Sequence, residues 1–246
     1  MSKDTKIHFD CPYLEKQIRQ EFLYRFGSSH GDRAIIRADM AKLNVDLSKE
    51  NGHFVLNDCD ISDITPLVDL PDLKSLFVNS SRIKDFSSLN ILPKFIDLTL
   101  GPAVPKEGIP SSSSSRPRLL TFTPPSLEEP TSLEIVDLTP LTGLNNLESL
   151  NMVSLHHIRD VSPLSGLENL RELKLSGYSL TDYSPLYGLT NLKELFLPYC
   201  QLTDYAVLTK LRSLEYLTLI HSKFTDRQRS MLYEALPQCK PGPSWL

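Results

Sequence analysis

The chain has 246 residues, of which 40% are apolar and 23% are charged, with a formal net charge of −4 and an isoelectric point near 5.9. This apolar share suffices for a continuous core, and the slightly acidic balance argues against nucleic acid as a partner. No stretch approaches the roughly 18 consecutive apolar residues of a membrane span, and the charged start of the chain does not resemble an export signal. We therefore expect a cytoplasmic protein without a membrane partner, with secretion by a signal-independent route as the alternative.

Residues 1–52 lie outside the repeat described below and predict an N-terminal helical cap. Asp10 and Pro12 form a helix start signal, and apolar residues then recur at helical spacing. A second, short helix is expected from Arg37 to Lys42, with Met40 and Leu43 facing inward. Such a cap covers the apolar end of a stacked core and keeps the first strand from pairing with another molecule.

Residues 53–224 repeat with a period of about 22 residues. The pattern L-x-x-L-x-L, in which other apolar residues replace some Leu, fits Leu73/Leu76/Val78, Phe95/Leu98/Leu100, Pro117/Leu120/Phe122, Leu147/Leu150/Met152, Leu170/Leu173/Leu175, Leu192/Leu195/Leu197 and Leu214/Leu217/Leu219, with Phe54 and Leu56 one step earlier. A period in the low twenties with this pattern predicts an α/β fold, the right-handed leucine-rich repeat solenoid. Each turn contributes one short strand to a parallel sheet on the concave face and a loop or 3₁₀ turn to the convex side.

The second half of each turn carries an aspartate before a short helical segment, as in Asp182-Tyr183-Ser184-Pro185-Leu186. The carboxylate can accept backbone N–H groups, and the proline suits the start of a 3₁₀ turn. The seven members are Asp63, Asp85, Asp137, Asp160, Asp182, Asp204 and Asp226. They could be mistaken for metal ligands or catalytic acids, but one per turn on the outer rim favours a structural role.

The repeat is irregular over residues 101–134. Residues 101–117 contain five consecutive serines and lose the outer apolar positions, whereas the strand positions Leu120 and Phe122 survive. An excess of eight residues follows at 123–134. We expect a mobile loop followed by a longer, partly ordered one. Either the repeat has decayed here, or the loops serve binding or modification, since long loops in compact domains are often functional.

Residues 225–246 predict a C-terminal helical cap. Thr225 and Gln228 match a capping box, and the helix that follows should run to about residue 236, with Met231, Leu232, Ala235 and Leu236 facing inward. Pro237 would end it, and Trp245 is expected to fold back onto the last turn.

These turns resemble those of bacterial internalin-type leucine-rich repeat proteins, which read I-x-D-[ILV]-[ST]-P-L-x-x-L-x-x-L-x-x-L-x-[LV]. Residues 180–197 fit this pattern almost position by position, residues 9–19 and 37–43 are similar to the family's helical cap, and residues 236–240 resemble its end cap. The regulatory subunit of protein phosphatase 1 has similar turns and ranks second. The resemblance implies a curved coil that binds another macromolecule and implies no enzyme chemistry. Because no export or wall-anchoring signal is seen, the family's role in host-cell adhesion is not expected here.

The position that usually holds Asn in this family holds Cys59, Cys200 and Ser222 in three of the turns. A small polar group there can bond the next loop inside the coil, so we interpret the cysteines as buried thiols of a loop ladder, with a redox or catalytic thiol as the alternative. No Cys/His cluster, phosphate loop or catalytic motif is present. The adjacent pair His156-His157 is a poor metal site, because neighbouring side chains point in different directions. We therefore expect no metal, no cofactor and no catalytic residue.

The concave face is the face of the sheet opposite to the buried leucines, and alternate strand residues point to it. The residues expected to point outward are Ser75, Phe77, Asn79, Asp97, Thr99, Leu119, Thr121, Thr123, Ser149, Asn151, Val153, Glu172, Lys174, Ser176, Glu194, Phe196, Pro198, Tyr216, Thr218 and Ile220. Apolar and aromatic members cluster in the last two turns, which indicates a binding patch, although single exposed aromatics are ordinary. The predicted partner-binding residues are Phe196 and Tyr216 as anchors, Glu172, Lys174 and Glu194 as charged flank, Pro198 and Ile220 beside them, and Tyr199 and His221 on the rim.

The sequence thus predicts a non-enzymatic scaffold of the bacterial cytoplasm, a monomer that binds another protein on its concave face. One alternative is a secreted or injected effector that acts on a host protein. A less favoured one is an enzyme whose site lies on the inserted loop.

Overall fold

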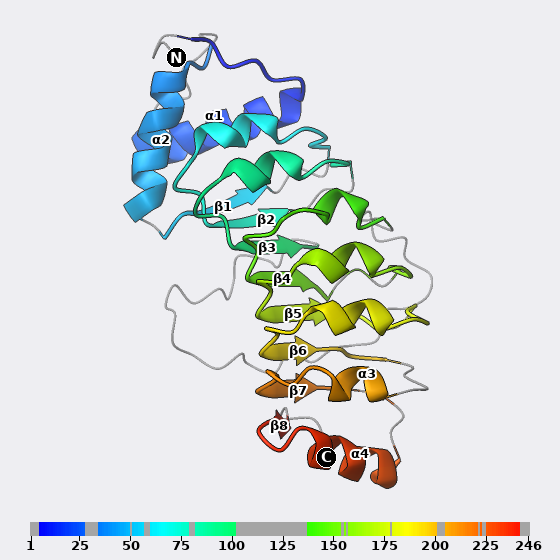
Figure 1. Ribbon diagram of the computed structural model, residues 1–246. Coiled ribbons are helices and arrows are strands. Elements are labelled where there is room, and N and C mark those ends of the chain that lie inside the picture. The colour runs from blue at the N-terminus through cyan, green and yellow to red at the C-terminus, as the bar shows by residue number, and fades with distance from the viewer. Residues whose placement is uncertain are drawn as a thin grey trace.

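The computed structural model describes residues 5–27, 34–49, 51–56, 60–78, 82–101, 137–153, 155, 157–177, 179–200, 205–220, 222 and 225–241. In these residues the chain forms a column of stacked turns, with two helices at its N-terminal end and one at its C-terminal end (Figure 1). The fold class predicted from the sequence, a leucine-rich repeat solenoid, is confirmed.

One parallel sheet of eight strands runs along the column. Its strands are β1 (His53–Leu56), β2 (Ser75–Val78), β3 (Asp97–Leu100), β4 (Ser149–Met152), β5 (Glu172–Leu175), β6 (Glu194–Phe196), β7 (Tyr216–Thr218) and β8 (Lys240–Pro241). Each strand pairs with the next one along the chain. The register aligns a row of buried residues, namely Phe54, Leu76, Leu98, Leu150, Leu173, Leu195 and Leu217. This row fixes the parity of every strand, so the residues between its members face the other way.

The opposite side of the column is built from short helical turns. They are η1 (Thr65–Asp69), η2 (Ser87–Ile91), η3 (Thr139–Leu141), η4 (Ser162–Gly166), η5 (Ser184–Gly188) and the α-helical α3 (Ala206–Thr209). Pro stands in the first turn of η1, η3, η4 and η5, where its fixed φ fits and its missing N–H costs no bond. Neither η2 nor α3 has such a Pro; η2 is still a 3₁₀ turn, whereas α3 is a single α-helical turn.

Five of the seven predicted aspartates have the structural role expected of them. A carboxylate oxygen of Asp63, Asp85, Asp137, Asp160 and Asp182 accepts the backbone N–H of the residue two positions later, at 2.7–2.9 Å. That residue begins the 3₁₀ turn, so each carboxylate satisfies a donor that the turn itself leaves unpaired. Asp204 and the side chain of Asp226 lie outside the described residues.

The N-terminal cap consists of α1 (Pro12–Phe26) and α2 (Arg37–Lys49). The prediction that Asp10 caps α1 is wrong, because Cys11 is the N-cap residue and no side chain bonds the first turn. Pro12 as the first helical residue supplies the start signal on its own, since it lacks an N–H that would need a partner. Gly27 ends α1 in the left-handed conformation with φ of 67°, and its N–H donates to the carbonyl of Leu23.

Helix α2 is longer than the short helix predicted from the sequence. Met40 and Leu43 face inward as expected, but the helix continues to Lys49, and Asn44 and Leu47 are also buried. The Asn44 amide donates to the carboxylate of Asp72 and its oxygen accepts the Asp72 backbone N–H, both at 2.7 Å. The buried face of α2, which packs against the first turns, therefore includes the polar residue Asn44 beside its apolar residues.

The C-terminal cap is α4 (Asp226–Ala235), and the predicted capping box is confirmed by reciprocal bonds between Thr225 and Gln228. Leu232 and Leu236 are buried. The prediction that Met231 and Ala235 also face inward is wrong, because both are exposed. The sulfur of Met231 instead contacts the Tyr205 hydroxyl at 2.9 Å. Trp245 lies outside the described residues.

Leu98 of β3 pairs directly with Leu150 of β4. Leu120 and Phe122, where the sequence predicts a further strand, lie outside the described residues. The eighth strand of the sheet is β8 at the C-terminal end, which the sequence pattern did not predict. Residues 102–136 lie outside the described residues, and so do the loops predicted there.

Candidate interaction surface on the concave face

Two columns of side chains cross the concave face, because the strands pair in register. The first column holds His53, Ser75, Asp97, Ser149, Glu172, Glu194, Tyr216 and Lys240, and the second holds Val55, Phe77, Thr99, Asn151, Lys174, Phe196 and Thr218. All of them are partly or well exposed. Neighbours in a column are separated by one strand spacing of about 4.8 Å, so each column is a continuous strip of surface.

The C-terminal half of this surface brings together the core of the predicted site. Glu172 and Glu194 are direct partners on β5 and β6, and Glu194 is the direct partner of Tyr216 on β7. Phe196 lies in the second column between Lys174 and Thr218. Two aromatic rings and two carboxylates therefore occupy three adjacent strands, as the repeat period predicted.

The charges on this half are unevenly paired. The ammonium group of Lys174 forms an ion pair with Glu172, and Glu215 on the rim pairs with Lys193 at 2.7 Å. No ion pair joins Glu194 to a cation among the described residues. The pKa of Glu194 is raised from its ordinary value, first by burial and then by repulsion from Glu172. Lys174 offsets this repulsion only in part, so the pKa of Glu194 stays raised.

The remaining predicted site residues are only partly brought to this surface. Pro198 is buried, so the prediction that it adds exposed surface is wrong. The prediction that Ser176 points outward at the equivalent position is wrong for the same reason, because it is buried after the end of β5, whereas the equivalent Val153 is partly exposed. Tyr199, with φ of 58°, and Ile220 are half-exposed in the turns that follow the strands. His221 lies outside the described residues.

A polar contact in the N-terminal half escaped the sequence analysis. The Ser75 hydroxyl donates to the Asp97 carboxylate at 2.9 Å, and its oxygen lies 3.0 Å from Nδ1 of His53. Because the serine proton is directed at the carboxylate, the imidazole is not placed to accept it, as a serine nucleophile would require. The 22-residue spacing of the three residues would have predicted their alignment in one column.

Cys200 is a buried thiol of the loop ladder, as interpreted from the sequence. Its sulfur lies 2.9 Å from the Ser222 hydroxyl of the next turn. Cys59 lies outside the described residues. A second ladder was not predicted: the side-chain amide of Asn191 donates to the carbonyl of Glu168 at 2.9 Å, and that of Asn169 donates to the carbonyl of Asn145 at 2.7 Å.

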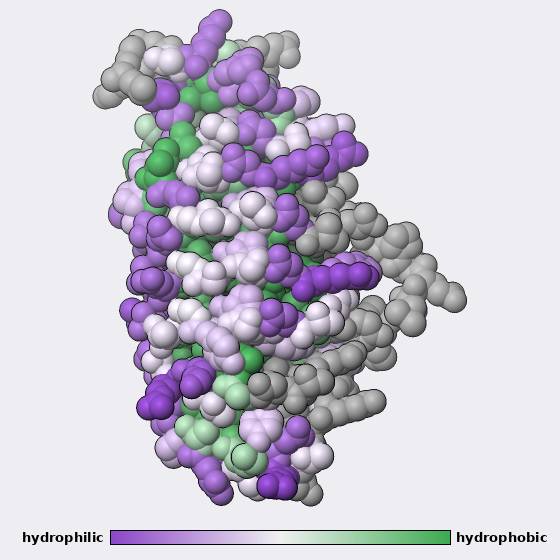
Figure 2. All heavy atoms as spheres, turned by 45° about the vertical axis from the view of Figure 1, so that its right-hand side comes forward, coloured by the Kyte–Doolittle hydropathy of each residue, from purple (hydrophilic) through white to green (hydrophobic). Residues whose placement is uncertain are grey.

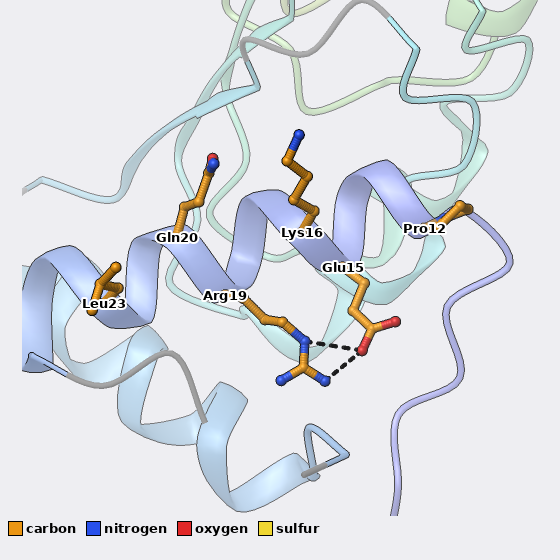
Figure 3. Close-up of a pocket in the computed structure, with 6 residues that line it drawn as sticks. All are labelled: Pro12, Glu15, Lys16, Arg19, Gln20 and Leu23. Carbon is orange, nitrogen blue, oxygen red and sulfur yellow. Dashed lines mark hydrogen bonds and ion pairs between the residues drawn. The ribbon is translucent and has the colours of Figure 1, made fainter. Parts of the chain in front are cut away.

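A shallow depression of about 330 Å³ lies on the solvent side of α1. It is lined by Pro12, Glu15, Lys16, Arg19, Gln20 and Leu23, which form one stripe of the helix, and Arg19 pairs with Glu15 across it at 2.6 Å (Figure 3). All these side chains belong to one helix, so the depression is an open groove.

In the described parts of the chain, no group of three His, Cys, Asp or Glu side chains could hold a metal ion, and no helix is long and apolar enough to span a membrane.

The side of the molecule that carries the 3₁₀ turns has a different character from the concave face. Figure 2 brings this side forward, and hydrophilic side chains dominate its coloured part, with apolar ones in scattered groups. The exposed Tyr187 of η5 is one of its aromatic residues. The two regular columns of aromatic and charged side chains lie on the sheet.

Comparisons with known proteins agree with this architecture. No family model and no curated protein sequence matches the chain. Among solved structures, internalin C2 from Listeria monocytogenes superposes with a TM-score of 0.64 at 22% identity, over 98% of this chain and 87% of that one. The internalin InlF from the same organism gives a TM-score of 0.56 at 21% identity, over 93% of this chain and 61% of that one.

These findings define the class of the protein, which is a leucine-rich repeat solenoid with helical caps. Within that class the chain has the internalin-type fold, and the resemblance inferred from the repeat pattern is confirmed at the level of the fold.

Proposed function

We propose that this protein is a non-enzymatic scaffold that binds another protein on the C-terminal half of its concave face. One observation carries the proposal: Tyr216 is 42% exposed on β7, and Phe196 is half-exposed on the neighbouring strand. Neither ring is needed to fill the core, which the leucine row already closes. Exposed aromatic residues on a rigid surface with charged neighbours are typical anchors of protein interfaces.

The geometry of the sheet supports binding of a macromolecule. Eight strands spaced by about 4.8 Å give a surface roughly 35 Å long, which is long enough for a protein interface of standard size. The register of the strands holds the side chains before the partner arrives, so little conformational entropy is lost on binding. An enzyme on the inserted loop remains the less favoured function, and an effector acting on a host protein would use the same surface.

The experiment is affinity capture with a matched set of variants. The immobilised protein, the double variant Phe196→Ala/Tyr216→Ala and the control Tyr187→Ala are incubated with lysate of the source organism, and captured proteins are quantified by mass spectrometry. Tyr187 is a suitable control because it is 40% exposed but lies on η5.

We expect the double variant to capture at least tenfold less of the partner than the unchanged protein does, because each aromatic anchor of an interface contributes about 2 kcal/mol or more. Its melting temperature should stay within a few degrees of the unchanged protein. Undiminished capture by the folded double variant would refute the proposed site. A bacterial cytoplasmic location and a monomeric state stay predictions, which cell fractionation and light scattering would test.

A further inference from the structure

The surroundings of Glu194 define what the partner should present to this surface. In the first column of the concave face, Glu194 has Glu172 on one side and Tyr216 on the other. On its own strand, Phe196 is the next residue that faces the same way. An incoming side chain at this point therefore meets carboxylates and aromatic rings together.

The carboxylate pair is a local excess of negative charge. Like charges directly opposite each other on neighbouring strands are unfavourable. The one cation among them, Lys174, makes its ion pair with Glu172. It offsets only part of the burial and of the repulsion from Glu172 that raise the pKa of Glu194. A cation supplied from outside would remove this repulsion, so the surface is complementary to a positively charged group.

The ring of Tyr216 already attracts a cation within the chain. The ammonium group of Lys240 lies 5.6 Å from the centroid of this ring, within the range of a cation–π interaction. Lys240 lies on β8, on the side of Tyr216 away from Glu194, because β7 stands between β6 and β8. On the other side of Tyr216, β6 places Glu194 as its direct partner, so a carboxylate and an aromatic ring are neighbours at this point.

We propose that the partner protein inserts an arginine side chain between the Glu194 carboxylate and the rings of Tyr216 and Phe196. Arginine fits better than lysine, because its planar guanidinium can bond a carboxylate with two parallel N–H groups and stack on an aromatic ring at the same time. This inference rests on the proposed function, since it names the chemistry that the same surface recognises.

The test uses a library of displayed linear peptides selected on the immobilised full-length protein. The tightest peptide is then synthesised together with a copy in which citrulline replaces arginine, which keeps the shape and removes the charge. Dissociation constants of both peptides are measured for the unchanged protein, for Glu194→Gln, for the double variant Phe196→Ala/Tyr216→Ala and for Glu168→Gln. The last variant removes one negative charge outside the sheet, where Glu168 is exposed.

We expect the selected peptides to share an arginine, and we expect citrulline to weaken binding to the unchanged protein roughly tenfold. Glu194→Gln should weaken the arginine peptide by a similar factor but leave the citrulline peptide nearly unchanged, because the two changes remove the same interaction. Glu168→Gln should bind like the unchanged protein. Melting temperatures within a few degrees would show that all variants are folded.

Two different failures can be told apart. Peptides that need Phe196 and Tyr216 but tolerate both citrulline and Glu194→Gln would overturn the arginine inference and leave the proposed function standing. Selection of no peptide, or of peptides that bind the double aromatic variant equally well, would count against the proposed function and the inference together.

Discussion

At the residue scale, the two faces of each strand have separate tasks. Leu173 of β5 is fully buried between Leu150 and Leu195 of the neighbouring strands. Lys174, the next residue, faces outward and makes an ion pair on the surface. Core packing and the proposed recognition therefore depend on alternate positions of the same four-residue segment, so a substitution can alter one without altering the other.

The leucine row can be tested by a single truncation. We expect Leu173→Ala to lower the free energy of unfolding by about 2–5 kcal/mol, because it opens a cavity in a core that cannot fully collapse around it. The control is Thr99→Ala on the outward side of β3, which should change stability little. Equal losses for the two variants in denaturant melts would contradict the assignment of the faces.

At the element scale, the 3₁₀ turns depend on charged caps. The pKa values of Asp85, Asp137 and Asp182 are lowered from the ordinary value of 3.8, because the residue two positions later donates hydrogen bonds to each carboxylate. A group with a lowered pKa in the folded state stabilises the fold above its ordinary pKa and loses that contribution as the pH falls. The stability of the protein should therefore decline with acidification from about this pH downward.

Replacement of these three aspartates by asparagine separates the charge from the cap. Asparagine keeps the side-chain oxygen that accepts the backbone N–H but does not titrate. We expect the triple variant to be folded at pH 7 and to lose less stability than the unchanged protein when denaturant melts are repeated below pH 3.8. An unchanged pH profile would show that these caps do not contribute to acid stability.

The sequence predicts the elements well wherever the 22-residue pattern is complete. The buried strand leucines, the 3₁₀ turns and the α4 capping box all follow from local rules, because repeated contacts with the preceding turn leave few alternatives. The pattern alone does not predict which strands pair, because pairing depends on contacts between distant segments, as for β3 and β4.

Other differences have the same origin in tertiary contacts. The end of α2 was not predicted, because its last turns are held by tertiary contacts: the bonds of Asn44 to Asp72, the ion pair of Asp46 with Arg25 and the burial of Leu47. Strand β8 lacks an apolar alternation and is defined by its pairing with β7. In the candidate site, the period correctly aligned Glu172, Glu194 and Tyr216, whereas the burial of Pro198 depends on where β6 ends.

At the scale of the whole molecule, the caps close the core, and the sheet presents the surface on which we propose that the partner binds. Helices α1 and α2 pack on the first turns and α4 on the last, so both apolar ends of the column have covers (Figure 1). The concave face between them is left to side chains that the core does not need. The outward side chains can therefore change without changing the fold, so we expect them, and not the fold, to determine which partner binds.

Site-specific photo-crosslinking tests the central claim most directly. A photoreactive phenylalanine analogue is placed at Tyr216 or, in a second sample, at Tyr187, and each protein is irradiated in lysate of the source organism. The two tyrosines are 42% and 40% exposed, so accessibility alone would give similar crosslinks. Our account predicts a specific crosslink to one partner protein from position 216 and none from position 187. A partner crosslinked from position 187 but not from position 216 would contradict it.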